Sequence, residues 1–346
     1  MTLACPHRVL SFVLIITAVV APARAGDLDP PAGPIGPTMK PLDQVEPRIA
    51  INAQNTPGDG LSRFRITQSG SYHLTGNVTG QLNRHGIVIA ASNVTVDLMG
   101  FALQGSIASL DGISVHGARS NITIRNGTVT GWGQDGVDLR HGASSSDEIG
   151  IGAHLDGLHS SSNGSHGFVL CRGAVVTNCT ASLNSGNGFI STNAGTNVLR
   201  SCTALDNGGT GISTDNGSIV SHCTAENNGG HGISVSVGST VINCQSRRNN
   251  VDGIRNSGSC SIRGNNCDLN GFVGINVTGT RSRIEENHCT LNGVGVSTAG
   301  SANLIIRNSA GGNTTNYSIG SGNHFGTILN NPGQITSGNP WANIGY

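Results

Sequence analysis

The chain has 346 residues, of which 52 are glycine, and its 19 basic residues balance 19 acidic ones. A neutral chain with a single lysine, Lys40, lacks the clustered positive charge that nucleic acids and anionic membranes require, so neither is an expected partner. Recurring aliphatic residues without net charge argue against intrinsic disorder, and an aromatic content of 3% argues against a core of bulky aromatic side chains.

The N-terminal region has the pattern of an export signal. Arg8 is followed by the apolar run Val9 to Val20 and by the small residues Ala23 and Ala25, a pattern typical of a secretory signal peptide over residues 1–25. The apolar run spans about 18 Å as a helix, too short to cross a bilayer. We therefore expect a secreted protein (extracellular, cell-surface or periplasmic) without a membrane span after cleavage. Residues 26–60 are predicted to be a proline-rich linker and N-terminal extension.

Residues 61–333 contain a repeat. A glycine followed by an aliphatic residue or phenylalanine recurs from Gly86 to Gly295, with intervals of 21 residues over the last four steps. An asparagine stands four residues before most of these glycines: Asn163, Asn184, Asn207, Asn228, Asn249 and Asn270. Short alternating runs between the markers are typical of strands, so the period predicts a parallel β-solenoid of about 12 coils of ~21–23 residues. Residues 334–346, with Trp341 and Tyr346, are predicted to form a C-terminal cap.

The glycine and asparagine markers carry a resemblance to a known group. The stretch Asn227-Asn228-Gly229-Gly230-His231-Gly232-Ile233 is similar to the repeats of right-handed parallel β-helix proteins of the pectin-lyase-like superfamily. This resemblance implies an all-β, single-stranded right-handed parallel β-helix, and we expect a monomer. The flanks of the repeat resemble those of secreted bacterial β-helix proteins with no assigned activity.

Eight cysteines remain after the predicted signal peptide. Cys179, Cys202, Cys223 and Cys244 each lie five residues before a marker asparagine and are expected to stack in one column. Cys267 and Cys289 lie three residues before theirs, which places them in the neighbouring column. We favour buried free thiols, with disulfides between adjacent coils as the alternative. The spacing gives no zinc motif.

Charge is concentrated in the coils that begin near Gly112 and Gly136. Adjacent carboxylates separate each other's pKa values, which is how two aspartates supply an acid and a base. An arginine beside them suits a uronate carboxylate, and a tryptophan suits a sugar ring. The alternative is an ordinary solvated turn rich in aspartate. The candidate catalytic residues are Asp111, His116, Asp135, Asp138 and Arg140, and the candidate substrate-binding residues are Trp132, His141 and Arg255.

Two classes of function remain open at this stage. The first is a secreted binding or scaffold protein that contacts a polysaccharide or a cell-surface glycan. The second, implied by the superfamily resemblance, is a lyase, hydrolase or epimerase that acts on acidic polysaccharide at the aspartate cluster. Of the polygalacturonase-like motifs only Gly230-His231-Gly232 is present, so no catalytic motif supports the second class. No cofactor or metal is expected, although calcium at the aspartates is left open. A second set of charged residues could attract an anionic glycan: Arg247, Arg248, Asp252, Arg255, Arg263, Arg281 and Arg283.

Overall fold

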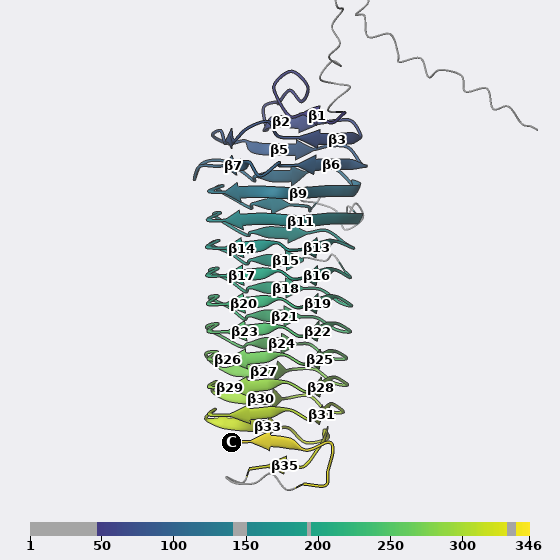
Figure 1. Ribbon diagram of the computed structural model, residues 1–346, viewed down its shortest axis with the longest axis vertical. Coiled ribbons are helices and arrows are strands. Elements are labelled where there is room, and N and C mark those ends of the chain that lie inside the picture. The colour runs from purple at the N-terminus through teal and green to yellow at the C-terminus, as the bar shows by residue number, and fades with distance from the viewer. Residues whose placement is uncertain (1–46, 141–150, 192–194, 331–336) are drawn as a thin grey trace, which may run out of the picture. The chain divides into compact units, whose positions relative to one another are not determined.

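The computed structural model describes residues 47–140, 151–191, 195–330 and 337–346. These residues form short strands and turns without a helix, so none of them belongs to a helix that could span a bilayer. The predicted signal peptide and most of the proline-rich linker lie outside the described residues. Figure 1 shows the strands of residues 47–346 stacked as successive coils along one axis.

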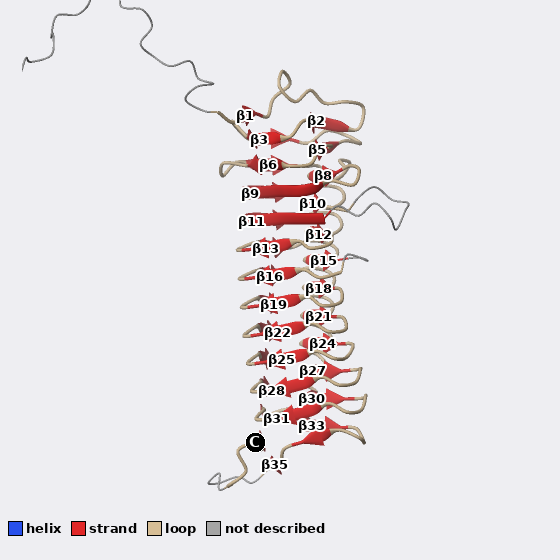
Figure 2. Cartoon of the chain, turned by 90° about the vertical axis from the view of Figure 1, so that its right-hand side faces the viewer, coloured by secondary structure: helices blue, strands red, loops and turns tan. Residues whose placement is uncertain are grey.

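The strands form two sheets in which the pairings between named strands are parallel. Figure 2 shows the two sheets on different faces of the stack of coils. The smaller sheet has twelve strands: β2 (Ser62–Ile66), β5 (His85–Ile89), β8 (Ile113–Val115), β10 (Val137–Asp138), β12 (Phe168–Leu170), β15 (Phe189–Ser191), β18 (Ile212–Thr214), β21 (Ile233–Val235), β24 (Ile254–Asn256), β27 (Val273–Val277), β30 (Val294–Thr298) and β33 (Thr315–Ile319).

The larger sheet has 24 strands and consists of two ribbons over most of its length, such as β13–β16–β19 and β14–β17–β20. Its strands are β1 (Ile49–Ala50), β3 (Gly70–His73), β4 (Val78–Thr79), β6 (Val94–Asp97), β7 (Ala102–Gln104), β9 (Ser120–Thr130), β11 (Ile151–Ser161), β13 (Val175–Thr177), β14 (Thr180–Ser182), β16 (Val198–Arg200), β17 (Thr203–Leu205), β19 (Ile219–Ser221), β20 (Thr224–Glu226), β22 (Thr240–Ile242), β23 (Gln245–Arg247), β25 (Ser261–Arg263), β26 (Asn266–Asp268), β28 (Arg283–Glu285), β29 (His288–Thr290), β31 (Leu304–Ile306), β32 (Ser309–Gly311), β34 (His324–Phe325), β35 (Ile328–Leu329) and β36 (Asn343–Gly345).

The twelve-stranded sheet receives one strand from each coil, which confirms the prediction of a parallel β-helix of about twelve coils. Its strands pair in register, so like residues form columns. The residue after each marker glycine is buried in the core, for example Ile212, Ile233 and Ile254. The next residue along the strand faces outward because successive side chains alternate between the two faces. Phe168 and Phe189 stack within the core with ring centroids 4.8 Å apart.

The marker asparagines form a buried ladder along the stack. Each side-chain amide donates to the Oδ1 of the next asparagine, at 2.9 Å from Asn163 to Asn184 and 3.0 Å from Asn249 to Asn270. The same Oδ1 atoms also accept backbone N–H groups, as from Asn228 to Asn249 at 3.1 Å. These bonds satisfy polar groups that the coils would otherwise bury without partners, which is costly. The ladder therefore stabilises the corners between coils.

The cysteine columns lie where the spacing predicts them. The residues that follow Cys179, Cys202, Cys223 and Cys244 pair in register, and the eight cysteines of the described chain are buried and unpaired. Cys267 pairs with Ser246 and with Cys289, which confirms the second column. In the next coil asparagine replaces cysteine in the first column. Asn265 occupies the column position after Cys244, and its Oδ1 accepts the backbone N–H of Cys244 at 2.8 Å. A second asparagine ladder, which the sequence analysis missed, continues from there: Asn265, Asn287, Asn308 and Asn343.

At both ends the strand pairing extends beyond residues 61–333, the range predicted for the repeat. β1 pairs with β3, so parallel pairing already begins within the segment predicted as an N-terminal extension. Near the C-terminus, β36 pairs with β32, and Asn343 completes the second asparagine ladder. The described part of the predicted cap thus adds a rung to the solenoid.

Candidate functional site

The residues just before the marker glycines form a polar column, which places Oδ1 of Asp111 and of Asp135. The backbone N–H of Asp135 donates to Oδ1 of Asp111 at 3.0 Å, and that of His166 donates to Oδ1 of Asp135 at 2.8 Å. The column continues at both ends, because the N–H of Asp111 donates to Nδ1 of His85 and that of Asn187 donates to Nδ1 of His166. At His166, an Nδ1 that accepts an N–H carries no proton, which holds this side chain as a neutral Nε2–H imidazole, whereas Nδ1 of His85 lies 3.2 Å from both the N–H and Oδ2 of Asp111.

Arg140 bonds Asp135 and Asp138, whereas Oδ2 of Asp111 lies 3.2 Å from Nδ1 of His85. Nη2 of Arg140 donates to Oδ2 of Asp135 at 2.6 Å and to Oδ2 of Asp138 at 3.1 Å, and its Nε donates to Oδ1 of Asp138 at 3.0 Å. One carboxylate oxygen from each of Asp111, Asp135 and Asp138 lies within 4.8 Å of the others. The sequence analysis therefore groups these four residues correctly. Asp111 and Asp135 are buried, Asp138 is half-buried, and Arg140 covers them from the solvent side.

Strand register explains why the cluster faces outward. Asp138 on β10 lies between Ser114 on β8 and Val169 on β12, in the outward column of the twelve-stranded sheet. His116 follows β8, and its ring meets that of His85 edge-on with centroids 5.2 Å apart. His116 therefore lies beside the cluster, as predicted, and His85 joins it.

Burial sets the protonation behaviour of the site. It raises the pKa of Asp138 above its ordinary value, against the lowering effect of Arg140. It lowers the pKa of His116, to which the neighbouring His85 adds, and it lowers the pKa of His166. The site thus combines an aspartate that holds its proton more tightly than usual, neutral imidazoles and a guanidinium. These groups can exchange protons with a bound ligand and pair with an anion.

The three aspartates supply the oxygen ligands that calcium prefers, but the arrangement does not fit a bound ion. Calcium takes six to eight oxygen ligands, and here Arg140 already bonds the outer oxygens of Asp135 and Asp138. A cation at this position would have to displace the guanidinium. The cluster is neutralised by arginine rather than arranged around an open cation position.

Trp132 does not have the role that the sequence suggests. The expectation that it stacks on a sugar ring is wrong, because only 1% of its surface is exposed and its Nε1–H donates to the carbonyl of Leu103 at 3.1 Å. A Cβ atom on Gly86, Gly105 or Gly112 would stand within 3.0 Å of the tryptophan. These glycines make room for the indole inside the core.

The other two predicted binding residues are not part of the cluster as the structure describes it. His141 lies outside the described residues. Arg255 lies in the same outward column as Asp138 but five strands further along, a separation of about 24 Å at the usual strand spacing. There its Nη1 contacts Nε2 of His231 at 3.2 Å. The sequence analysis missed His85 and His166, although both occupy the position before a marker glycine, as Asp111 and Asp135 do.

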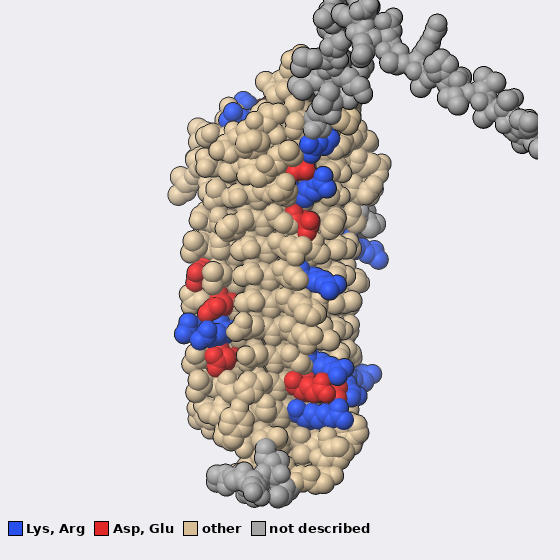
Figure 3. Space-filling model, in the orientation of Figure 1, with Lys and Arg blue, Asp and Glu red and all other residues tan. Residues whose placement is uncertain are grey.

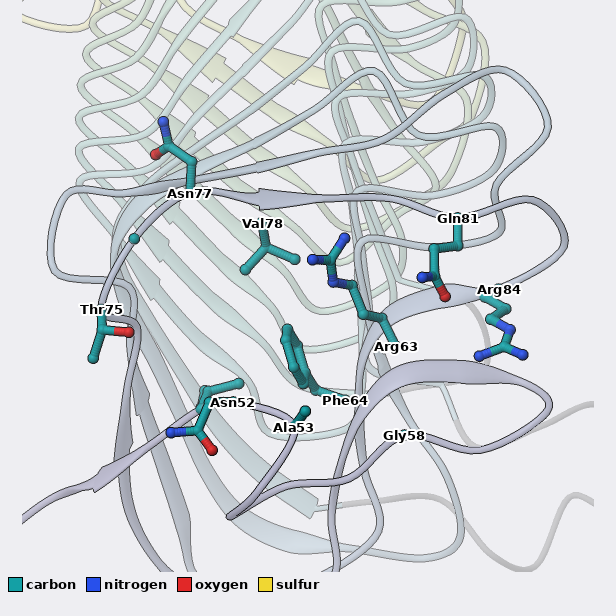
Figure 4. A pocket seen from close by; sticks show the side chains of 12 residues that line it. Asn52, Ala53, Gly58, Arg63, Phe64, Thr75, Asn77, Val78, Gln81 and Arg84 are labelled. Atoms are coloured by element: carbon teal, nitrogen blue, oxygen red, sulfur yellow. The ribbon is translucent and has the colours of Figure 1, made fainter.

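A separate pocket of about 530 Å³ lies at the first coils. Figure 4 shows Arg63 and Phe64 side by side in this pocket, where the guanidinium lies 5.5 Å from the ring centroid. Arg63 also donates to the carbonyl oxygen of Thr79. None of the cluster residues lines this pocket, so it is a feature of the end of the stack and is distinct from the aspartate site.

Comparison with known proteins identifies the same architecture. A family model for a right-handed β-helix region matches residues 111–267, while no curated protein matches the chain. The A-module of a mannuronan C-5 epimerase (AlgE4) from Azotobacter vinelandii has 18% identity and a TM-score of 0.62, covering 79% of this chain and 86% of the module.

Two further solved structures resemble the chain at lower identity. A mutant of the periplasmic alginate epimerase AlgG has 13% identity and a TM-score of 0.53, with 86% of this chain and 80% of that protein covered. The catalytic domain of an α-1,3-glucanase in complex with nigerose has 11% identity and a TM-score of 0.53, with coverages of 78% and 59%. At these identities the likeness concerns the fold. The chain therefore has the fold of a right-handed parallel β-helix, and a family model for that fold matches its central part.

Proposed function

We propose that this protein is exported and binds a polysaccharide on the outward face of the twelve-stranded sheet, at the cluster of Asp111, Asp135, Asp138 and Arg140. The observation that carries the proposal is the junction of Asp135, Asp138 and Arg140 on that face, in a chain with only 11% charged residues. Carboxylates accept hydrogen bonds from sugar hydroxyls, and a guanidinium donates to ring oxygens and carboxylates. The two groups together suit a hydroxyl-rich ligand that bears acidic groups.

The surface around the cluster supports a linear ligand. Next to Asp138 the outward column holds Ser114 and Val169, which are buried, and then Ile190; polar residues follow from Ser213 through Ser234 to Arg255. Stacked strands repeat at about 4.8 Å, so these last three coils offer hydrogen-bonding groups at regular intervals along the stack. The solved structures of similar fold include epimerases of alginate and mannuronan and a glucanase, and this supports a polysaccharide as the ligand.

The test is a binding screen with purified full-length protein. Polyuronates and neutral polysaccharides are compared by affinity electrophoresis and calorimetry. We expect saturable binding to at least one polyuronate and at least tenfold weaker binding by Arg140→Ala. The matched control is Arg247→Ala, because Arg247 forms a similar ion pair with Asp268 (3.2 Å) on the other sheet. Asp138→Asn, which keeps the shape of the side chain, covers the case in which Arg140→Ala fails to fold. Unchanged affinity in the folded cluster variants would refute this site.

A second candidate function uses the same cluster for catalysis. It is favoured by two histidines whose pKa is lowered, His116 beside His85 and His166 beside Asp135, and by Asp138, whose pKa is raised by burial. In a lyase or epimerase of acidic polysaccharide a base removes the proton beside the uronate carboxylate, while Arg140 would neutralise that carboxylate. A hydrolase would instead use the aspartates as acid and base.

Catalysis is distinguished from binding by the products. Unsaturated sugars, new reducing ends and a changed ratio of uronate epimers mark a lyase, a hydrolase and an epimerase in turn. The reactions are followed with and without calcium. Because Arg140 already neutralises the aspartates, we expect the activity not to depend on calcium. An activity that survives Asp135→Ala unchanged would exclude this cluster as the catalytic site.

A further inference from the structure

A second pocket, of about 370 Å³, lies near the C-terminal end on the larger sheet. Three successive strands, β28, β31 and β34, contribute one column of outward residues, in which Arg283 pairs with Leu304 and Leu304 with His324. The residues that give the pocket its character are Arg283, Leu304, Ile306, His324, Phe325 and Trp341. The pocket thus combines an apolar floor with a guanidinium and two aromatic rings.

The aromatic rings in this pocket are exposed, which is unusual for this chain. Phe325 is 52% exposed and Trp341 is 47% exposed, while aromatic residues make up only 3% of the sequence. Arg307 lies over the indole of Trp341, 4.4 Å from the ring centroid, and does not line the pocket. The rest of the indole is left for a ligand in the pocket. An exposed aromatic face beside polar groups is the usual platform for a flat, partly apolar ligand.

Trp341 is held in place through its backbone. Its N–H donates to Oδ1 of Asn339 at 2.9 Å, and its carbonyl oxygen accepts the N–H of Arg307 at 3.4 Å. The Nε of Arg307 donates to the carbonyl of Pro340 at 3.1 Å. These bonds fix the backbone at Trp341, and the Arg307 guanidinium contacts the ring itself, so the indole loses little freedom when a ligand stacks on it.

The charge around the pocket favours an anion. Arg263, Arg283 and Arg307 surround two acidic residues, Glu285 and Glu286. Three arginines against two glutamates leave one positive charge in excess. Figure 3 shows charged side chains gathered towards this end of the stack. Arg283 bonds Glu285 through its Nε at 2.7 Å, and the side chain is about half exposed, so its outer nitrogens can meet a ligand carboxylate.

We propose that this pocket binds a uronic-acid residue of an acidic saccharide, with the sugar ring stacked on Trp341 and the carboxylate paired with Arg283. The apolar face of a sugar ring can pack on the indole while its hydroxyls bond the polar groups at the edge of the pocket. The carboxylate pairs with the excess positive charge. The proposal goes beyond the function proposed above, because it uses the other sheet and shares no residue with the aspartate cluster. Either site can therefore fail without the other.

The chain contains two tryptophans, and this makes the test direct. Trp132 is buried, so quenching by a saccharide reports on Trp341. The protein is titrated with oligogalacturonate and, in parallel, with a neutral cello-oligosaccharide of the same length. We expect saturable quenching by the charged sugar, at least tenfold weaker binding by Arg283→Ala, and loss of the signal in Trp341→Ala. The buried emission of Trp132 in each variant verifies that the fold is intact.

A matched control separates this site from general electrostatics and from the aspartate cluster. Arg200→Ala removes an exposed arginine of the same sheet, on β16, far from the pocket, and should leave the affinity unchanged. Asp138→Asn should leave the quenching unchanged as well, because it affects only the other site. The proposal is overturned if the neutral sugar quenches equally, if Arg283→Ala binds as the wild type does, or if quenching depends on protein concentration as expected for contact with a second copy of the chain.

Discussion

Replacing Arg140 by methionine tests the electrostatics of the aspartate cluster. The substitution Arg140→Met keeps most of the side-chain volume and removes the guanidinium that bonds Asp135 and Asp138. Three aspartates then remain close together, with their nearest oxygens within 4.8 Å of one another and no cation between them. Removing one partner of a buried ion pair costs about 3–5 kcal/mol of unfolding free energy. Because Arg140 is 40% exposed and solvent screens it, we expect about 2–3 kcal/mol.

The loss should depend on pH with a definite sign. The folded-state pKa of Asp138 is already raised by burial, and it rises further without Arg140, which is the main group that lowers it. An unfolded aspartate has a pKa of about 3.9. Between these two values the folded state holds a proton that the unfolded state has lost, so the unfolding free energy falls as pH rises. The deficit of Arg140→Met should be small near pH 4 and complete above the folded-state pKa.

The assay is equilibrium unfolding in urea at several pH values between 4 and 8. The matched control is Arg125→Met, because Asp97 loses Arg125 but keeps Arg48 at 3.2 Å and the backbone N–H of Met99 at 2.9 Å. We expect this control to lose less than about 1 kcal/mol. Equal losses in the two variants, or a loss in Arg140→Met that does not change with pH, would contradict the account of the cluster.

Three further predictions concern the core. Asn249→Ala removes five side-chain hydrogen bonds and should lower the unfolding free energy, measured in urea, by about 3–5 kcal/mol. The control Asn250→Ala changes an exposed neighbour and should stay within about 0.5 kcal/mol of the wild type. Equal losses in the two variants would show that the asparagine ladder does not stabilise the fold. The eight cysteines of the described chain are buried, so a thiol reagent cannot reach them and native protein should not react with it at neutral pH; rapid labelling of folded protein would contradict this. Gly112→Ala should cost about 3 kcal/mol, because the added Cβ would overlap Cγ1 of Val129 and lie 2.6 Å from the carbonyl oxygen of Gly136. It would also lie 3.0 Å from the indole Nε1 and should shift the emission of Trp132; unchanged stability and emission would contradict this packing.

The parts of the fold that follow from spacing could be read from the sequence. Cys267 and Cys289 were assigned to a different column from Cys244 because they stand two positions closer to their asparagines, and strand pairing confirms this. The same counting brought Asp111, Asp135 and Asp138 together. Register is transmitted from coil to coil by identical hydrogen bonding, so a residue's position within its coil largely determines its neighbours.

Features that depend on volume rather than spacing could not be read in this way. Trp132 was predicted to contact a sugar because it is close in sequence to Asp135, whereas Gly86, Gly105 and Gly112 leave space for it inside the core. Two pairs of stacked glycines, Gly86 with Gly112 and Gly80 with Gly105, were the available signal. The pocket at Trp341 was missed for another reason. Its lining comes from strands and from the C-terminal segment beyond them, which follows no repeat.

The even spacing of the middle coils has a consequence for how the two candidate sites relate. From Asn207 to Asn270 each ladder amide stands 21 residues after the last, and each makes the same bonds. Deleting residues 229–249 would bring Asn228 directly against Asn270, with every column preserved. Each coil removed shortens the stack by about 4.8 Å without altering either site. The number of coils in the middle of the molecule therefore sets the distance between the two sites along the axis of the stack, while each site keeps its own sheet.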